Sequence, residues 1–233
     1  MARIVKEKEY ATKRNEILDV AQRLIYTKGY EQMAIQDILD DIQISKGAFY
    51  HYFESKGMLL EALTERMIDE AEQLLTPIVQ DPHLAALEKL HLYFDTAARW
   101  KTAQKTYLLA LLRVWYTDDN AVVRQKVFSA SAKSVIPMLT SIISQGIQEG
   151  VLDTPYPEQM GEVIYSLFQG LGDAFSGLLL SGEPRQDALP RAESIVAAYM
   201  QALERIVGAP QGSLHLIDKA TLKEWFLPLN ANV

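Results

Sequence analysis

Five ring-bearing side chains in a row, Phe49 to Phe53, lie between two Ser-Lys-Gly triplets in the stretch ISKGAFYHYFESKGMLLEAL, residues 44–63. Lysine, tyrosine and histidine are residue types that contact phosphates and the edges of nucleic-acid bases. Aromatic residues at this density also occur in buried helices and around cofactors. The stretch therefore raises three possibilities: a surface that binds an anion, a buried structural helix, or part of a cofactor site.

Helical periodicity separates these side chains into two groups. At about 100° per residue, Phe49 and Phe53 fall on one side of the helix, while Lys46, Tyr50 and His51 fall on the other. We expect the two phenylalanines to pack inward and the other three side chains to face outward. A duplex groove suits the outward face, which offers one cation and several neutral hydrogen-bond donors.

Small and polar residues flank this outward face. Gly47 and Ala48 allow the helix axis to approach bases and sugars closely, and Ser45 is a good N-cap beside N–H groups that can hold a phosphate. Lys56 adds a cation at the start of the following helix. Because any cluster of three helices gives a similar wheel, periodicity alone leaves an ordinary surface without a ligand as an equal alternative.

The elements that position these residues are predicted to be helices. An amphipathic helix closed by Gly29 precedes a short helix over 35–42, and the turn before Ser45 completes a helix-turn-helix. No alternating run of β-branched residues marks a strand, so the predicted fold class is all-α.

The rest of the chain is predicted to form longer helices with apolar faces. One begins at Ser55 and ends at Pro77, and the next has Asp81 as its N-cap and Pro82 at its first position. Further helices are expected over 104–117, over 120–149 with a kink at Pro137 and a stop at Gly150, over 157–181, over 189–207 before Gly208, and over 218–226.

Composition limits the class of protein. The 233 residues carry a net charge of -7 and no cysteine, which excludes disulfides, thiolate metal sites and cysteine nucleophiles. Residues 1–56 hold nine basic and nine acidic residues, whereas the remainder holds 14 and 21, so the first part is the less acidic. The N-terminus has no signal-peptide pattern, and apolar stretches such as FSGLLL are too short to cross a bilayer. We expect a cytoplasmic protein without a membrane partner.

The run GYEQMAIQDILDDIQISKGAFYHYFESKGMLLEAL, residues 29–63, resembles the N-terminal DNA-binding domain of the TetR family of bacterial repressors. The shared features are a Gly-aromatic pair after the first helix, an Asp-Ile second helix, Ser-Lys-Gly, Tyr-x-Tyr-Phe, and Ser-Lys before a Leu-Leu helix. The resemblance covers roughly residues 12–65. It implies a helix-turn-helix domain at 1–56, linked by a helix at 55–76 to a ligand-binding and dimerisation domain at 77–233 with a C-terminal tail helix.

The resemblance also implies a set of DNA-facing residues. Tyr50 matches the family tyrosine that contacts the backbone and the groove edge, and Lys56 matches the lysine that contacts phosphate. The full DNA-facing set is Gln36, Ser45, Lys46, Gly47, Ala48, Tyr50, His51 and Lys56.

Three positions depart from the family pattern. Gln43 stands in the turn where glycine is frequent, so a positive φ there would cost free energy. Ala34 replaces a capping threonine, and Gly57 replaces an acidic residue after Lys56. These departures put affinity in doubt more than function.

In the family, the larger domain holds a small-molecule pocket. The corresponding part of this chain is rich in aromatic residues. For each of them, core packing is the alternative role. Aromatic walls suit a flat apolar or cationic effector, while no carboxylate cluster indicates a metal and no motif indicates a cofactor. The candidate pocket residues are Tyr93, Trp100, Tyr107, Trp115, Met138 and Phe168.

The helix over 157–181 contains four glycines, which weaken a lone helix by up to about 1 kcal/mol each. They fit a helix that packs closely against another. With the alanine-rich helix over 189–207, it resembles the family's dimer interface, in which each subunit contributes two helices to a four-helix bundle. Close packing within one subunit is the alternative.

Enzyme motifs are missing from the sequence. The four histidines have no metal-ligand spacing, no G-x-S-x-G is present, and GLG lacks the third glycine of a dinucleotide fingerprint. We therefore expect no enzymatic activity. The resemblance to the TetR family implies a homodimeric, ligand-responsive transcriptional regulator, a repressor released from a palindromic operator by a small effector. The alternative is a small-molecule-binding or protein-interaction module that keeps the scaffold without reading DNA. The basic N-terminal arm is expected to be a solvated terminus, with a minor-groove contact as its alternative.

Overall fold

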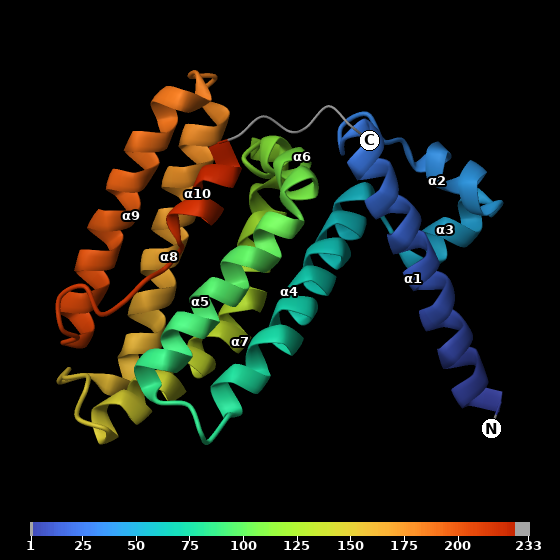
Figure 1. Cartoon of the computed structure of the whole chain (residues 1–233). Helices are drawn as coiled ribbons and strands as arrows, with labels where there is room; N and C mark the ends of the chain where they lie inside the picture. Colours follow the sequence, from blue (N-terminus) through green and yellow to red (C-terminus); the bar gives the residue numbers. More distant parts are fainter. Residues whose placement is uncertain (1, 227–233) are drawn as a thin grey trace. The chain divides into compact units, whose positions relative to one another are not determined.

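The structure, a computed structural model, describes the backbone of residues 2–226 and the side chains of these residues except 2–6, 119, 185 and 186. Within this range the chain forms α-helices and one short 3-10 helix, and the described residues contain no strand. The prediction of an all-α fold is therefore confirmed (Figure 1).

The helices gather into two compact units. One contains the described residues up to Met67 together with Thr106–Phe128, and the other contains Ile68–Lys105 together with the described residues from Ser129 onward. The long helices α4 (Lys56–Gln80) and α7 (Ala121–Gln148) contribute one part to each unit. The domains predicted from the sequence, residues 1–56 and 77–233, stay a prediction.

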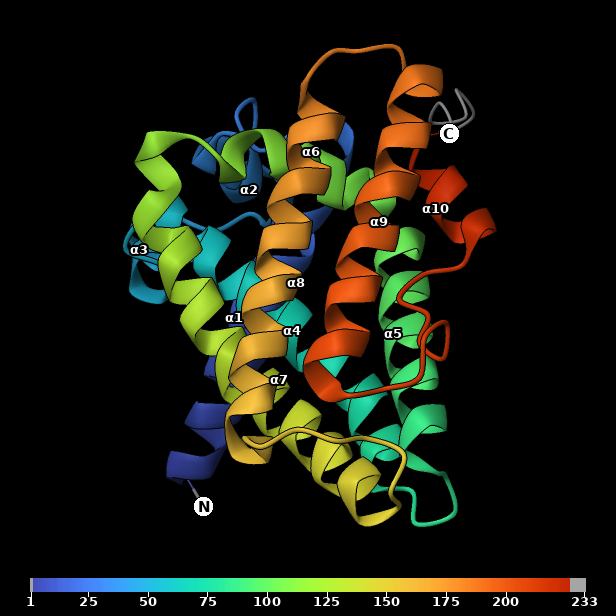
Figure 2. The same cartoon turned by 90° about the vertical axis from the view of Figure 1, so that its left-hand side faces the viewer.

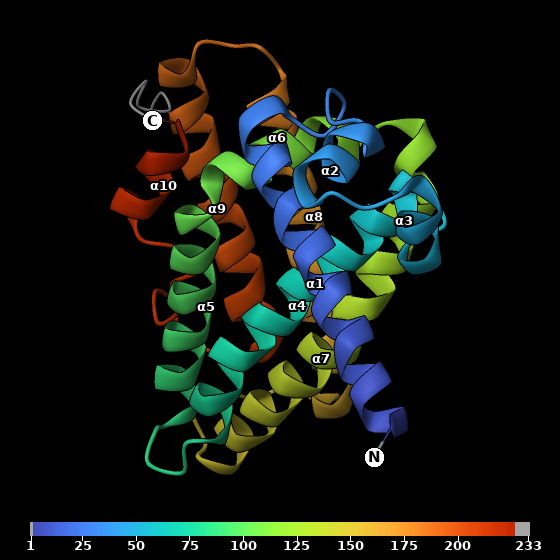
Figure 3. The same cartoon turned by 90° about the vertical axis from the view of Figure 1, so that its right-hand side faces the viewer.

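The first unit is built around the N-terminal helix. It contains α1 (Ala2–Lys28), α2 (Ile35–Ile42), α3 (Lys46–Tyr52) and the start of α4, joined by α6 (Lys105–Trp115), η1 (Asp118–Asn120) and the start of α7. Figure 3 shows α2 and α3 beside α1. Apolar side chains from four of these helices form the core, with 0 % exposure at Ile17, Ile25, Ile38, Phe49 and Leu59.

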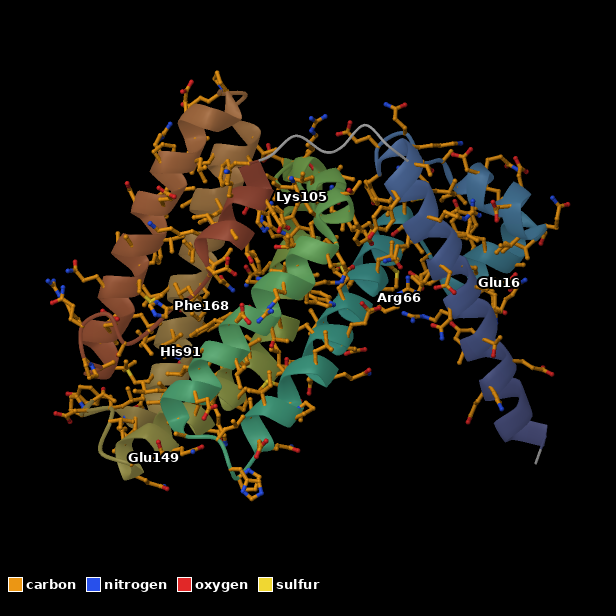
Figure 4. The ribbon with its side chains drawn as sticks, in the orientation of Figure 1. Glu16, Arg66, His91, Lys105, Glu149 and Phe168 are labelled. Carbon is orange, nitrogen blue, oxygen red and sulfur yellow. The ribbon has the colours of Figure 1, made fainter. Side chains whose placement is uncertain are left out.

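Polar and aromatic contacts tie α1 to its neighbours in this unit. Arg66 of α4 donates to the Asp19 carboxylate at 2.6 Å and also to the Gln22 side-chain carbonyl (Figure 4). The ring of Tyr26 stacks on that of Tyr107 in α6, with centroids 5.0 Å apart. Within the first unit, α1, the start of α4 and α6 are therefore tied together.

The second unit is a layered bundle. It contains α5 (Ala86–Ala103), α8 (Pro157–Leu180), α9 (Arg185–Val207) and α10 (Lys219–Phe226), with the later parts of α4 and α7. Helices α8 and α9 pack side by side along most of their length (Figures 1 and 2). The core includes Leu90, Phe94, Ile143, Ile164 and Leu203.

The C-terminal tail packs on the body of its own chain. Helix α10 contacts α5 and α9 (Figure 2). The Trp225 indole N–H donates to Thr102 Oγ1 at 2.8 Å, and Leu222 and Phe226 are buried against Leu178 and its neighbours. These apolar side chains of the tail helix are therefore buried within one subunit.

The predicted end of the fourth helix at Pro77 is wrong. Helix α4 continues to Gln80 with Pro77 inside it. A proline inside a helix costs about 3 kcal/mol, but only one turn follows it here. Ile78 and Val79 in that last turn pack against the core of the second unit. This packing offsets the loss of the backbone hydrogen bond that Pro77 cannot donate.

The predicted N-cap of the fifth helix is also wrong. Asp81 accepts a hydrogen bond from the His83 N–H within a turn, and the helix begins only at Ala86. The Ala86 N–H donates instead to the carboxylate of Glu149, 2.9 Å away and 63 residues later in the chain (Figure 4). This hydrogen bond and one from Gln145 lower the pKa of Glu149. A long-range carboxylate thus replaces the local cap.

The remaining helices lie close to their predicted ranges. Gly29, Gly150 and Gly208 all have positive φ at helix ends, as expected for glycine C-caps. Pro137 lies inside α7, and α9 begins at Arg185, four residues before the predicted start. The helix over 218–226 is confirmed as α10.

The expectation that no segment is long enough to cross a bilayer holds for uninterrupted apolar runs but not for whole helices. Windows of 18 residues in α7 and α8 both reach a mean hydropathy of 1.3, which is enough by length and composition alone. Core helices of soluble proteins meet the same criterion, so this property does not by itself indicate a membrane protein. Only 17 % of the α8 window is buried within this chain.

Candidate nucleic-acid interface

Helix α3 has the two-sided character predicted for it. Phe49 and Phe53 are buried, with 0 % and 2 % exposure, and pack into the core of the first unit. Lys46, Tyr50 and His51 are exposed, and the Lys46 ammonium lies 6.0 Å from the centre of the Tyr50 ring one turn away. The periodicity argument for the two faces of this helix is therefore confirmed.

The start of α3 is capped by its own sequence. Ser45 Oγ accepts a hydrogen bond from the Ala48 N–H at 3.1 Å, so the predicted N-cap is confirmed. Ser45 and Gly47 are exposed, while Ala48 is half-buried. This small, polar first turn leaves room for a ligand to approach the helix closely.

The turn between α2 and α3 places a residue other than glycine in a backbone conformation that favours glycine. Gln43 adopts φ 52° and ψ 48°, in the left-handed region, and the next residue's N–H bonds back to the Leu39 carbonyl. A non-glycine residue there costs on the order of 1 kcal/mol. The Gln43 side-chain amide donates to the Asp40 carbonyl, and its backbone N–H donates to the Leu39 carbonyl, so hydrogen bonds to α2 help to hold this conformation.

Asp37 anchors the start of α2. Ala34 occupies the N-cap position and has no side chain to cap the helix, as predicted, but its own N–H donates to Asp37 at 2.8 Å. Lys28, the last residue of α1, donates to the same carboxylate at 2.7 Å. These hydrogen bonds, Lys28 first, lower the pKa of Asp37.

The predicted residue Gln36 lies exposed on α2. Its side-chain amide donates to Asp40 one turn later, at 2.7 Å. Gln36 therefore faces solvent with its amide already oriented, and a contact of this residue with DNA stays a prediction.

Lys56, the first residue of α4, lies at the junction between α4 and the turn that follows α1. Its ammonium is 3.4 Å from the Glu31 carbonyl oxygen and 4.4 Å from the centre of the Tyr30 ring, while the Tyr30 hydroxyl donates to the Lys56 carbonyl at 3.1 Å. Desolvation lowers the pKa of Lys56 and raises that of Tyr30 to about 12. An ammonium has three donors, so this half-buried lysine can hold the junction and still reach a phosphate.

Sequence reasoning missed how far α1 extends and what it contacts. The helix begins at Ala2, so the basic N-terminal arm is helical rather than frayed. Tyr10 packs against His51 and Tyr52 of α3, and the Arg14 guanidinium lies 5.2 Å from the Phe53 ring centre. Tyr10 and Arg14 lie one helical turn apart, and this spacing was the pattern in the sequence that could have predicted a shared contact face on α1.

The six predicted pocket residues are divided between the two units. Tyr93, Trp100, Met138 and Phe168 belong to the second unit, and Tyr107 and Trp115 belong to the first.

Two of the six are core residues of their own unit. Tyr93 and Tyr107 are 4 % and 0 % exposed, and burial raises the pKa of Tyr93. Phe168 packs edge-on against Phe94, with ring centres 4.9 Å apart, and the ring centres of Trp115 and Phe128 are 6.2 Å apart. A ligand role for the six stays a prediction.

An open hollow of about 430 Å³ on α9 has a different lining. Pro190, Arg191, Ser194 and Ile195 surround it, and none of these was predicted to bind a ligand. Among the described residues, no group of three or more histidine and acidic side chains is placed to hold a metal ion.

Comparison with known families gives two matches along the chain. Residues 17–63 match the model of bacterial regulatory proteins of the tetR family, and residues 113–174 match a tetracyclin repressor-like C-terminal domain. The first match covers all of α2 and α3, and the second covers all of α7 and most of α8.

Individual proteins are similar over most of the chain. The HTH-type transcriptional repressor NemR of Escherichia coli K12 is 26% identical over 188 residues, covering 79% of this chain and 94% of that protein. The HTH-type transcriptional regulator TtgR of Pseudomonas putida is 24% identical over 178 residues, 73% of this chain and 83% of that protein.

Solved structures share the fold. A TetR-family transcriptional regulator from Pectobacterium atrosepticum superposes with a TM-score of 0.63 at 20% identity, covering 88% of this chain and 98% of that one. The reduced form of E. coli NemR gives a TM-score of 0.56 at 20% identity over 84% of this chain and 98% of that one. At this level of identity, the likeness concerns the arrangement of helices.

Proposed function

Because the chain belongs to the TetR family of bacterial regulatory proteins, we propose that it is a DNA-binding repressor whose α3 enters the major groove of a palindromic operator. The observation that carries the proposal is the division of α3 into a buried face, Phe49 and Phe53, and an exposed face, Lys46, Tyr50 and His51. The buried face fixes the helix on the body, and the exposed face is left for the duplex.

The charge of the reading surface is compatible with DNA although the chain is acidic overall. Attraction to phosphate depends on charges within a Debye length of about 8 Å. Arg23 and Lys28 form ion pairs with Asp41 and Asp37 at 2.6 and 2.7 Å, so their charge is largely compensated. We assign the phosphate contacts of this unit chiefly to Lys46 and Lys56.

The exposed face of α8 supports a homodimer through α8 and α9. An 18-residue window of α8 has a mean hydropathy of 1.3, and only 17 % of its residues are fully buried. Apolar side chains such as Leu171 and Phe175 are half-buried, and Leu180 is exposed, so part of their surface is left for a partner. Gly172 and Gly177 face open space, whereas Gly161 and Gly170 lie against other helices of the same chain. Two of the four glycines therefore serve internal packing, and the other two leave a smooth face for a second copy.

The regulator is proposed to respond to a small effector. The second unit carries the aromatic residues Tyr93, Trp100 and Phe168, which suit an apolar or aromatic compound. Binding would change the spacing of two reading heads with a coupling on the order of 1–3 kcal/mol. The proposed role also implies a cytoplasmic location, because a repressor must share a compartment with its operator.

Selection of binding sequences from random duplex DNA by the full-length protein tests the proposal. We expect enrichment of an inverted repeat whose half-sites lie about 34–36 Å apart, one helical turn, or a multiple of it. Failure to enrich any sequence, or enrichment of an asymmetric single site, contradicts the proposal of a dimeric repressor.

A further inference from the structure

An aromatic cluster joins the first part of α1 to the end of α3. Tyr10 lies 4.7 Å from Tyr52 and 5.6 Å from His51 between ring centres, and His51 lies 5.3 Å from Tyr52. All three separations lie in the range of about 4.5–7 Å that aromatic pairs favour, and two of the three pairs are edge-on. The three rings therefore contact one another in a closed triangle.

A second contact one turn later repeats this connection. The Arg14 guanidinium lies 5.2 Å from the centre of the Phe53 ring. Tyr10 and Arg14 continue along α1 from the buried residues Ile17 and Leu18. The face of α1 that forms the core thus extends beyond the core and reaches the C-terminal end of α3.

Helix α3 needs such support. It has seven residues, about two turns, and Phe53 immediately after it is extended, with φ -139°. Isolated helices of this length are unstable, and exposed side chains at their ends change rotamer freely. Tyr10 is itself 39 % exposed, so its packing contributes modestly to the core and mainly restricts the two rings that it contacts.

We propose that Tyr10 is a positioning residue for DNA recognition, which holds the His51 imidazole in the orientation that reads the operator. The proposal rests on the proposed function of α3 as the reading helix. Tyr10 lies outside the segment that matches the family model, residues 17–63. A side chain that is fixed before binding loses less conformational freedom on binding, which raises affinity and specificity.

A double-mutant cycle on the selected operator tests the proposal. The proteins are the wild type, Tyr10→Ala, His51→Ala, the double variant, and Tyr10→Phe as the matched control that keeps the ring. We expect His51→Ala to weaken operator binding about tenfold, as expected for removal of one base-reading side chain. Tyr10→Ala should weaken it several-fold, the double variant no more than His51→Ala, and Tyr10→Phe hardly at all.

The NMR chemical shift of His51 in the free protein is a second test, because it does not depend on the overall stability of the variant. The His51 Cε1 proton resonance should shift in Tyr10→Ala, because a neighbouring aromatic ring is removed, and stay in place in Tyr10→Phe. Thermal unfolding of each variant shows that the proteins are folded at the temperature of the binding assay.

The outcomes separate the positioning role of Tyr10 from the reading function. If the loss of affinity in the double variant equals the product of the two single losses, the positioning role of Tyr10 is overturned. The same holds if the His51 resonance does not move in Tyr10→Ala. Both results leave α3 as the reading helix. A wild-type protein that binds no selected duplex overturns the proposed function, and the role of Tyr10 in recognition falls with it.

Discussion

Asp37 shows how a single residue can secure the reading surface without facing DNA. Its carboxylate accepts hydrogen bonds from the last residue of α1 and from the N-cap of α2, which lacks a capping side chain. Both bonds favour the ionised form, so the pKa of Asp37 in the folded protein lies below its usual value. The stabilisation is present above the unfolded-state pKa of about 3.9 and disappears as the pH falls through the folded-state pKa.

We predict that Asp37→Asn lowers the thermal midpoint by a few degrees at pH 7, because the amide cannot replace a charged acceptor for both donors. The difference from the wild type should begin to shrink below about pH 4 and vanish below the lowered folded-state pKa, where the wild-type carboxyl group is protonated and, like the amide, uncharged. Calorimetry across this pH range measures it. Asp69→Asn, at an exposed position on α4, is the control, and an equal, pH-independent loss of stability in both variants would contradict the assigned role.

At the residue scale, the sequence predicted what depends on local spacing. The inward Phe49 and Phe53 and the outward Lys46, Tyr50 and His51 follow from 100° periodicity alone. The contacts that the sequence missed join residues far apart in the chain, and no local pattern specifies which partner a side chain finds. The DNA contacts themselves stay predictions.

At the scale of elements, α8 combines two kinds of glycine. A Cβ added at Gly161 would lie 2.1 Å from Thr140 Oγ1 and 2.5 Å from the Ile136 carbonyl oxygen, so α7 and α8 are in close contact there. A Cβ at Gly177 would meet no atom within 4 Å. The same residue type thus has opposite consequences at two places on one helix.

We predict that Gly161→Ala destabilises the protein by about 1–3 kcal/mol, because the helices must separate to admit the methyl group. Gly177→Ala should leave the stability of the single subunit unchanged or raise it by up to about 1 kcal/mol, since alanine is the better helix former. Urea denaturation of the two variants measures both effects. Equal destabilisation at both positions would show that α8 is packed differently from the structure.

The same scale shows where element boundaries escape the sequence. Asp81 and Pro82 form a plausible local helix start, yet α5 begins at Ala86, where Glu149 from beyond the end of α7 accepts the N–H. Pro77 similarly fails to end α4, since the final turn gains apolar packing. In both cases tertiary contacts outweighed a local signal, while the existence and order of the helices were predicted.

At the scale of the whole molecule, the apolar but little-buried α8 is the feature that calls for a second copy. We predict that the 26.3 kDa chain elutes at twice this mass, and that Gly177→Arg produces a monomer that is still folded, because the charge lies on the proposed interface. Size-exclusion chromatography with light scattering and circular dichroism measures both properties.

Gln73→Arg, at an exposed position on α4, is the matched control and should remain dimeric. A monomeric wild-type protein would contradict the proposed dimer. A Gly177→Arg protein that stays dimeric would show that the interface lies elsewhere.

The central claim is that the exposed face of α3 binds DNA, and salt-dependent fluorescence anisotropy on the selected operator tests it most directly. We predict that Lys46→Ala and Tyr50→Ala each weaken binding at least about tenfold. Lys46→Ala should also reduce the slope of log K against log salt by about 0.9 for each phosphate that the variant no longer neutralises. Lys133→Ala, at an exposed position in the second unit, should bind as the wild type does. Unchanged affinity and slope in both α3 variants would contradict the claim.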